Sequence, residues 1–121
     1  MYKIKVSKKD GRGLYATKDI PKGTVIFIAE LIILNKEETA HMEKTVLKYY
    51  NFNYAEKRNC LVLGDGMLFN HQTPDNVSYK MIKKNKREVM QYKANRNIKK
   101  GEQLYIDYTK DEVIDLEAYM S

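Results

Sequence analysis

Turn-forming glycines, prolines and asparagines interrupt this sequence so often that the runs between them are short. Short runs bounded by such residues are typical of strands rather than of long helices. Near the amino terminus, Tyr2, Ile4 and Val6 alternate with lysines, which predicts a half-buried strand. We expect a turn at residues 10–13 and a second short strand at residues 14–17. The sequence therefore indicates a mostly β domain.

The middle of the chain contains its longest apolar run, residues 24–34, after a second turn at residues 20–23. This run predicts one or two strands buried on both faces, and we expect Glu30 within it to be a carboxylate at an edge. Asn35 is predicted to cap a short helix, with two glutamates at its positive end. The residues expected on the inner face of that helix are Met42, Val46 and Tyr49 or Tyr50.

The second half of the chain has the clearest pattern. Residues 77–81 alternate between apolar and polar positions, and after a lysine-rich turn around Asn85, residues 90–95 alternate in the same way. This pattern predicts a hairpin of two strands. A further strand follows, in which Leu104, Ile106 and Tyr108 share a face. Together, the patterns predict a single, mostly antiparallel β domain with small helical inserts.

Length and composition exclude several classes of protein. A chain of 121 residues allows one compact domain. Its single cysteine, Cys60, excludes an intramolecular disulfide, and with only two histidines the chain lacks the ligands for a zinc site of sulfur and imidazole. We therefore expect no metal. The longest apolar run is too short to cross a bilayer, and the amino terminus lacks the apolar stretch of a secretory signal. These features favour a cytoplasmic or nuclear protein without membrane association.

The net charge of +6 is unevenly distributed. Residues 80–100, here called the basic strip, contain nine basic side chains and one acidic side chain, whereas residues 101–121 contain six acidic and one basic. The basic residues are Lys80, Lys83, Lys84, Lys86, Arg87, Lys93, Arg96, Lys99 and Lys100. Two interpretations stay open. The strip either binds a polyanion such as nucleic acid, or it is a solvated hairpin that lysines keep soluble.

No conventional catalytic set is present. Cys60 has no activating neighbour, and residues 11–13 match only a fragment of a dinucleotide-binding motif, without the strand before and the helix after that this motif requires. Three segments nevertheless stand out together. They are Gly11-Arg12-Gly13-Leu14-Tyr15-Ala16 with Asp19-Ile20-Pro21-Lys22-Gly23, then Asn70-His71-Gln72-Thr73-Pro74-Asp75-Asn76, then Gly101-Glu102-Gln103-Leu104-Tyr105-Ile106-Asp107-Tyr108.

In this order and spacing, the three segments resemble the SET domain of protein-lysine methyltransferases, and the resemblance covers residues 6–108. The length is similar to that of the minimal, free-standing SET proteins of viruses and bacteria. The resemblance implies a mostly β fold of short antiparallel strands in small sheets, short helices and a carboxy-terminal segment threaded under a loop, like a pseudoknot. It implies a SET domain at residues 1–108 and an acidic tail at residues 109–121. That tail is either a short helix that closes the site or a surface helix packed on the core.

The second motif departs from the family pattern at one place. The family carries a proline directly before the closing asparagine, whereas here Pro74 stands one residue early and Asp75 takes that place. Asn76 still lies six residues after Asn70, so the loop length is kept. Because proline restricts its own φ and the preceding residue, we expect a local change in the path of the loop.

The resemblance implies transfer of a methyl group from the cofactor S-adenosylmethionine to a lysine side chain. A narrow apolar channel favours the neutral amine that this reaction needs. The first catalytic candidate is Tyr108, and the second is Tyr79, for which core packing is the alternative. The residues implied to bind the cofactor are Arg12, Gly13, Leu14, Asn70, His71 and Tyr108.

Other residues receive a structural interpretation. Arg12 is expected to face solvent while its backbone lies along the cofactor, and His71 is expected to act through its main chain. Tyr92 and Tyr105 are weaker aromatic candidates, for which packing is the preferred role. Asp107 is expected to stabilise a turn and the strand crossing.

The resemblance also implies the partners. The substrate would be a lysine in a flexible protein segment, with a histone tail as the leading candidate, and the basic strip would contact nucleosomal DNA beside it. A further expectation is a homodimer that completes the substrate groove. If the protein is viral, we expect it in the host nucleus. Two alternatives remain: a SET-fold binding module with little turnover, and a basic β domain that binds nucleic acid.

Overall fold

The computed structural model describes residues 1–54 and 58–110 as a mostly β domain, which confirms the predicted fold class. The strands within these residues are β1 (Tyr2–Ser7), β2 (Gly11–Ala16), β3 (Val25–Ile33), β4 (Asn51–Asn53), β5 (Asn59–Val62), β6 (Asn70–His71), β7 (Val77–Lys84), β8 (Arg87–Ala94) and β9 (Gln103–Ile106). The helical elements of the same part are α1 (Lys36–Met42) and the 3₁₀ helices η1 (Val46–Tyr49), η2 (Gly64–Leu68) and η3 (Tyr108–Lys110). Of the predicted acidic tail at 109–121, residues 111–121 lie outside the described residues, so its role stays a prediction.

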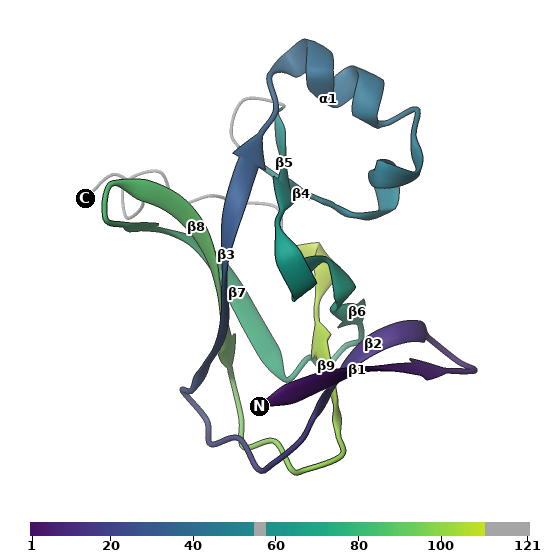
Figure 1. The fold of residues 1–121 in the computed structure, drawn as a ribbon, viewed down its shortest axis with the longest axis vertical. Coiled ribbons are helices and arrows are strands. Elements are labelled where there is room, and N and C mark those ends of the chain that lie inside the picture. Colours follow the sequence, from purple (N-terminus) through teal and green to yellow (C-terminus); the bar gives the residue numbers. More distant parts are fainter. Residues whose placement is uncertain (55–57, 111–121) are drawn as a thin grey trace.

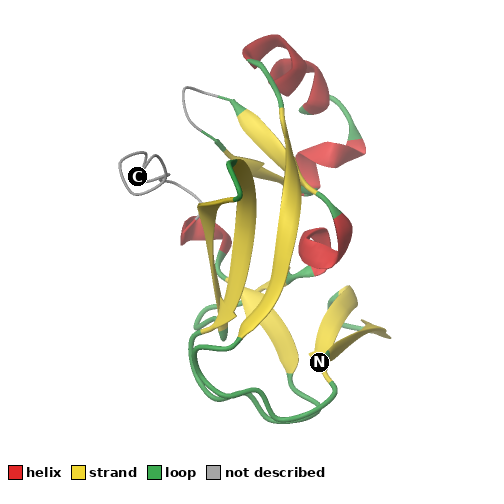
Figure 2. Cartoon of the chain, turned by 60° about the vertical axis from the view of Figure 1, so that its left-hand side comes forward, coloured by secondary structure: helices red, strands yellow, loops and turns green. Residues whose placement is uncertain are grey.

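The described strands form two sheets. A four-stranded sheet has the order β1-β2-β9-β6, and a five-stranded sheet has the order β4-β5-β3-β8-β7. Figure 1 shows the β1–β2 hairpin and α1 toward opposite ends of the molecule, with β9 in yellow near β2 and β6. Figure 2 shows the strands of the larger sheet running side by side. Among the described strand pairs, β6 and β9 are parallel and the others are antiparallel.

Strand β9 is the crossing point of the fold, because it lies between β2 from the start of the chain and β6 from its middle. The side chain of Asn76 holds β9 by its backbone. Its Nδ2 donates to the carbonyl of Gln103 at 2.8 Å, and its Oδ1 accepts from the N–H of Tyr105 at 2.8 Å. The Asn76 side chain is buried, with an exposed fraction of 2%. This arrangement agrees with the threaded carboxy-terminal segment that the resemblance implied.

The departure at Pro74 and Asp75 leaves this crossing intact. Asp75 is buried, and its Oδ1 accepts from Nδ2 of Asn95 at 2.9 Å, whereas Pro74 is exposed. The backbone N–H of Asn95 also donates to the carbonyl of Asn76 at 3.0 Å. A carboxylate therefore anchors the loop at the place where the family has a proline, and Asn76 keeps both of its contacts with β9.

The hairpin predicted in the second half of the chain is confirmed as β7 and β8, which pair over their whole length. The two residues of its tight turn, Asn85 and Lys86, have φ angles of 50° and 64°, a left-handed conformation that two-residue hairpin turns require. The inward face of β8 carries Tyr92, which is fully buried and stacks on Phe69 with ring centroids 4.5 Å apart. One apolar core therefore joins residues from both sheets.

The amino-terminal strand is present, but the prediction that it is half-buried is wrong. Ile4 and Val6 in β1 have exposed fractions of 48% and 76%. Among the described strands, β1 lies at the edge of its sheet and pairs with β2. Tyr2 packs against the core. The predicted turn at residues 10–13 is also displaced, since β2 already begins at Gly11 and the turn falls on residues 8–10.

The apolar run at residues 24–34 forms a single strand, β3, and the prediction that both of its faces are buried is wrong. Alternate side chains of β3 point to opposite sides of the sheet. One side faces the core at Ala29, whereas Glu30 and Ile32 on the other side are exposed to solvent. Glu30 forms an ion pair with Arg87 on β8, with Oε1 and Nε 2.7 Å apart.

The predicted cap of the short helix is confirmed. Oδ1 of Asn35 accepts from the N–H of Glu38 at 2.8 Å, and Oε1 of Glu38 accepts from the N–H of Asn35 at 2.9 Å. Met42 is buried as predicted, but the helix ends there, and Val46 and Tyr49 have exposed fractions of 66% and 70%. The physical reason is a second cap: Oγ1 of Thr45 accepts from the N–H of Leu47 at 3.1 Å and begins the separate helix η1.

We expect that replacing Asn76 with alanine destabilises the domain by about 2–3 kcal/mol, because the Gln103 carbonyl and the Tyr105 N–H lose a buried partner. Urea unfolding followed by circular dichroism measures this loss. The matched control is Asn35→Ala at the exposed cap of α1, for which we expect about 1 kcal/mol. Equal losses in the two variants would contradict the structural role assigned to Asn76.

Candidate active site

Two neighbouring pockets share one wall. The first has a volume of about 270 Å³, and its aromatic lining consists of Tyr49, Tyr50, Phe52, Phe69, Tyr79 and Tyr108. The second has a volume of about 210 Å³, and its polar lining includes Asp10, Arg12 and Asn70. The residues that line both are Tyr49, Tyr50, Met67, Phe69 and Tyr108. An apolar compartment and a charged compartment therefore meet at a wall of aromatic side chains.

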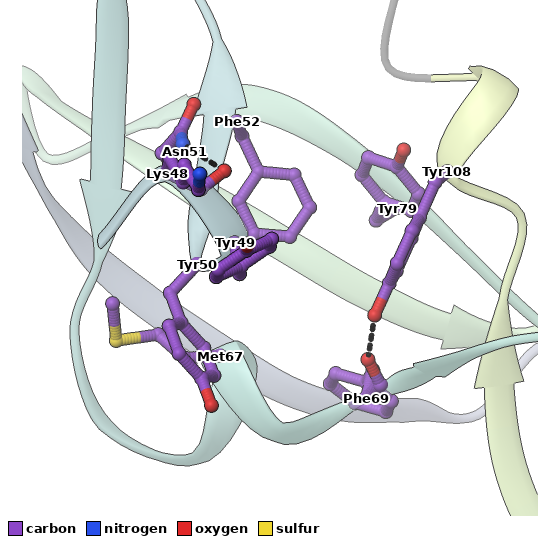
Figure 3. A pocket seen from close by; sticks show the side chains of 9 residues that line it. All are labelled: Lys48, Tyr49, Tyr50, Asn51, Phe52, Met67, Phe69, Tyr79 and Tyr108. Carbon is purple, nitrogen blue, oxygen red and sulfur yellow. Dashed lines mark hydrogen bonds between the residues drawn. The ribbon is translucent and has the colours of Figure 1, made fainter. Parts of the chain in front are cut away.

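Tyr108 lies in this shared wall, at the start of η3 and beyond the end of β9. Its hydroxyl donates a hydrogen bond to the carbonyl of Phe69 at 2.8 Å, which Figure 3 shows as a dashed line. Its side chain is half-exposed, with an exposed fraction of 49%. Burial of the phenol, and after it the nearby Tyr50, raises the pKa of Tyr108 above its usual value. The phenol therefore keeps its proton at neutral pH.

The prediction that Tyr108 shares a buried face with Leu104 and Ile106 is wrong. Those two side chains are fully buried, whereas β9 ends at Ile106 and the chain turns before it reaches Tyr108. The backbone N–H of Tyr108 donates to Nδ1 of His71 at 3.0 Å. This bond redirects the chain toward the pockets.

Tyr79 on β7 points inward, as predicted from the alternation of its strand. Its hydroxyl donates to the carbonyl of Asp107 at 3.2 Å, and its ring meets Phe52 edge-to-face with centroids 5.3 Å apart. Figure 3 shows Tyr79 and Tyr108 on the same side of the first pocket, with Phe52 between them and the residues of η1. Two phenols with fixed orientations thus lie on one side of the aromatic compartment.

Asn70 on β6 contributes the amide of the second pocket. Its Nδ2 donates to the carbonyl of Arg12 and to Oε1 of Gln103, both at 2.8 Å. Gly13 lies directly against this pair, because a Cβ atom added there would overlap Oε1 of Gln103 and approach Nδ2 of Asn70 to 2.8 Å. A larger residue at position 13 would therefore require the Gln103 and Asn70 amides to move.

The structure separates the predicted cofactor-binding residues into two groups. Arg12, Asn70 and Tyr108 line the second pocket, and Arg12 is exposed as expected. Gly13 and Leu14 lie behind that lining, and the Leu14 side chain is fully buried in the core. His71 is also outside the lining, and its imidazole contacts Tyr108, with ring centroids 5.0 Å apart.

Sequence reasoning missed several residues of the two pockets. Asp10 was assigned only to a turn, although its side chain lines the second pocket. Tyr50, Met67 and Phe69 line both pockets. The crowding of aromatic residues at 49–54 is a signal for Tyr50, whereas no pattern in the sequence singles out Met67 or Phe69. Tyr92 is a core residue, as expected, with its hydroxyl 3.3 Å from the Gly66 carbonyl.

Residues 1–54 and 58–110 contain no group of three or more His, Cys, Asp or Glu side chains placed to hold a metal ion. Within the same ranges, none of the helices has the length and apolar character needed to span a bilayer.

The sequence matches the model of the SET domain family over residues 11–109. It is 37% identical over 106 residues to the histone-lysine N-methyltransferase of Schizosaccharomyces pombe that is specific for lysine 37 of histone H3. The alignment covers 87% of this chain and 71% of that protein.

Two solved structures have a fold similar to that of this chain. A candidate histone methyltransferase of Plasmodium falciparum superposes with a TM-score of 0.75 and 28% identity, covering 89% of this chain and 96% of the other. A chain of the Chaetomium thermophilum polycomb repressive complex 2, in a structure bound to S-adenosylmethionine, gives a TM-score of 0.76 and 22% identity. It covers 91% of this chain and 15% of the other, so this likeness concerns the fold alone.

Proposed function

Because this chain belongs to the SET-domain family and is a protein-lysine methyltransferase, we propose a specific use for each of its two pockets. The second pocket binds S-adenosylmethionine, and the first receives the side chain of a substrate lysine. The observation that carries this proposal is the shared wall, since Tyr108 lines both pockets and its hydroxyl is fixed by the Phe69 carbonyl at 2.8 Å. Reacting groups in the two compartments would therefore meet beside one oriented phenol.

The polar groups of the second pocket match the charges of the cofactor. The amino-acid part of S-adenosylmethionine carries an ammonium and a carboxylate, and the pocket is lined by Asp10 and Asn70, with the exposed Arg12 beside them. Gly13 supports the same use, because the backbone there has no room for a Cβ atom. We propose that Arg12, Asn70 and Tyr108 contact the cofactor, and that Gly13, Leu14 and His71 support it through their backbone.

When bound, S-adenosylmethionine supplies a methyl group whose bond to the sulfonium sulfur breaks as its bond to the neutral lysine nitrogen forms, leaving a thioether and a methylated ammonium. The chain must therefore provide a neutral amine. The pKa of an exposed lysine is about 10.4, and an apolar compartment lowers this value because it disfavours the charged form. The rings that line the first pocket provide that environment.

The phenols of Tyr79 and Tyr108 supply alignment rather than a base. Each donates its proton to a backbone carbonyl, of Asp107 and of Phe69 respectively, so its oxygen has a fixed direction. The raised pKa of Tyr108 keeps that hydroxyl neutral. Fixed oxygen atoms near the electron-poor methyl group and the amine would stabilise the transition state by orientation.

The substrate class follows from the named relative. That protein is a histone-lysine N-methyltransferase, which supports a histone tail as the substrate of this chain and a nucleus as the place where it acts. The basic strip supports a contact with nucleosomal DNA, since Lys80, Lys83 and Lys84 on β7 are exposed. The homodimer stays a prediction.

We expect the wild-type protein to transfer label from S-adenosylmethionine to core histones, and Tyr108→Phe to fold normally while losing roughly 10²-fold in rate. The cause is the loss of the Tyr108 hydroxyl, which the Phe69 carbonyl orients in the wall that the two pockets share. Tyr54→Phe is the control, because Tyr54 contacts Glu88 and Arg58 instead. Wild-type turnover in Tyr108→Phe, with cofactor binding intact, would refute the assignment. Cofactor binding without any transfer by the wild type would favour the binding-module alternative.

Tyr79→Phe is expected to shift the products toward higher methylation states. Tyr79 lines the first pocket and its hydroxyl is held by the Asp107 carbonyl, so loss of this bond frees the ring to move and make room for a methylated amine. Mass spectrometry of a histone peptide after timed incubation measures the ratio of mono-, di- and trimethyl lysine. An unchanged rate together with an unchanged ratio would leave Tyr79 as a packing residue.

Charge reversal in the basic strip is expected to slow methylation of nucleosomes several-fold and to leave methylation of a free histone peptide unchanged. The variant is Lys83→Glu with Lys84→Glu, whose side chains are exposed near the tip of the β7–β8 hairpin. Lys18→Glu with Lys22→Glu makes the same change of charge at exposed positions outside the strip. Raising the salt concentration should reduce the difference between wild type and variant, because phosphate contacts are screened. If the two double variants change the rate of nucleosome methylation equally, the basic strip is only a solubilising surface.

A further inference from the structure

Behind the second pocket, a chain of hydrogen bonds links Asp10, Gln103 and Asn70. We propose that Gln103 is a positioning residue that fixes the orientation of the Asn70 amide, so that Oδ1 of Asn70 faces the ammonium group of the cofactor. The Asp10 carboxylate, at the far end of this series of hydrogen bonds, determines which groups donate and which accept along it. This inference rests on the proposed use of the second pocket for S-adenosylmethionine.

Gln103 is the centre of the chain. Its Nε2 lies 3.1 Å from Oδ2 of Asp10 and 2.9 Å from the hydroxyls of both Tyr15 and Tyr105. Its Oε1 accepts from Nδ2 of Asn70 at 2.8 Å. Asp10 and Asn70 line the second pocket, whereas Gln103 lies behind that lining. The glutamine therefore acts on the pocket through its two neighbours.

The order of donors and acceptors follows from the charge of Asp10. An ionised carboxylate only accepts hydrogen bonds, so the side of the Gln103 amide that faces it must be the NH₂ group. The carbonyl oxygen of Gln103 then faces Asn70 and accepts from its NH₂ group. A reversed Gln103 would bring its oxygen toward the carboxylate and its NH₂ toward the NH₂ of Asn70, and both contacts would be repulsive.

Asn70 is oriented by two acceptors on the same side. Nδ2 donates one hydrogen to Oε1 of Gln103 and the other to the carbonyl of Arg12, each at 2.8 Å. Because the amide is planar and both of its hydrogens are used, Oδ1 is the atom that Asn70 offers to a ligand in the second pocket. An oxygen acceptor suits the ammonium of S-adenosylmethionine and opposes its carboxylate.

Two neighbouring residues hold this arrangement in place. The Tyr105 hydroxyl donates to Oδ2 of Asp10 at 2.9 Å, and burial together with this hydrogen bond raises the pKa of Tyr105 to about 12. Tyr105 therefore remains a donor to Asp10 over the physiological pH range. On the other side, Gly13 leaves no room for a Cβ atom beside Gln103 and Asn70, so the two amides are confined against bare backbone.

The first test is the binding of two nucleosides to the full chain by isothermal titration calorimetry. S-adenosylhomocysteine keeps the ammonium and carboxylate of the cofactor, whereas 5′-methylthioadenosine lacks the amino-acid part. We expect Gln103→Met to weaken binding of S-adenosylhomocysteine roughly tenfold and to leave binding of 5′-methylthioadenosine unchanged, because only the first ligand reaches Asn70. Gln91→Met on β8, a half-buried glutamine whose Cα pairs with Ile28 and Lys80, is the control and should match the wild type for both.

The outcomes separate this inference from the proposed function. If the wild type fails to bind S-adenosylhomocysteine, the proposed function itself falls. If the wild type binds it and Gln103→Met binds equally well, the inference is wrong and the proposed function stands. If Gln103→Met loses both ligands to the same extent, the residue supports the pocket as a whole, and the orienting role is overturned.

A second variant, Gln103→Glu, tests the orientation of the amide at position 103 with a side chain of nearly the same size. In Gln103→Glu, the new carboxylate faces Asp10 and repels it, and the pKa of one of the two carboxyls is raised by this repulsion. The other titratable side chains facing position 103 are Tyr15 and Tyr105, and Lys5 lies over the Tyr15 ring at 4.9 Å.

At a pH below the raised pKa, one of the two carboxyls is protonated and donates a hydrogen bond to the other. The hydrogen bond between position 103 and Asp10 is then restored. Affinity of this variant for S-adenosylhomocysteine should therefore recover toward the wild-type value as the pH falls from about 8 to about 6, relative to the wild type at each pH. A constant ratio of affinities across that range would contradict the inference.

Discussion

The two hydrogen bonds from the Asn76 side chain to the backbone of β9 are the interaction on which the rest of this structure depends. These bonds hold β9 in its place between β2 and β6, which come from distant parts of the chain. Strand β9 carries Gln103 and leads to Tyr108. A buried asparagine is suited to this task because its amide satisfies one carbonyl and one N–H of the same strand at once. Neither pocket is lined by β9 itself, but Tyr108, which follows this strand, lines both of them.

The position of β9 explains how so small a domain separates two chemical environments. It pairs with β2 on one edge and with β6 on the other, and these two strands carry Arg12 and Asn70 of the second pocket. Beyond its end the chain turns at η3, and Tyr108 enters the aromatic wall. An apolar compartment and a polar one are thus neighbours that share a wall of aromatic rings.

Local patterns in the sequence were sufficient for some elements and insufficient for others. The β7–β8 hairpin was predictable because alternation and a two-residue turn are properties of neighbouring residues. The orientation of Tyr108 was not, because it depends on where β9 ends and on the carbonyl of Phe69, 39 positions away. Asp10 was missed for the same reason, since the chain brings it to Gln103 across 93 positions. The motifs predicted part of the pocket lining, and contacts between distant segments decide how those side chains lie.

The exposed edge of β1 has a consequence for the behaviour of the protein in concentrated solution. Ile4 and Val6 present apolar surface on a strand whose outer backbone groups face away from β2, which is the arrangement that promotes edge-to-edge association. Lys3 and Lys5 stand at the intervening positions, so their charges lie on the opposite face of the same strand. If β1 strands of two molecules approached each other, these like charges would come together and repel. The lysines therefore oppose fibril-like association, while β1 remains paired with β2 in its own molecule.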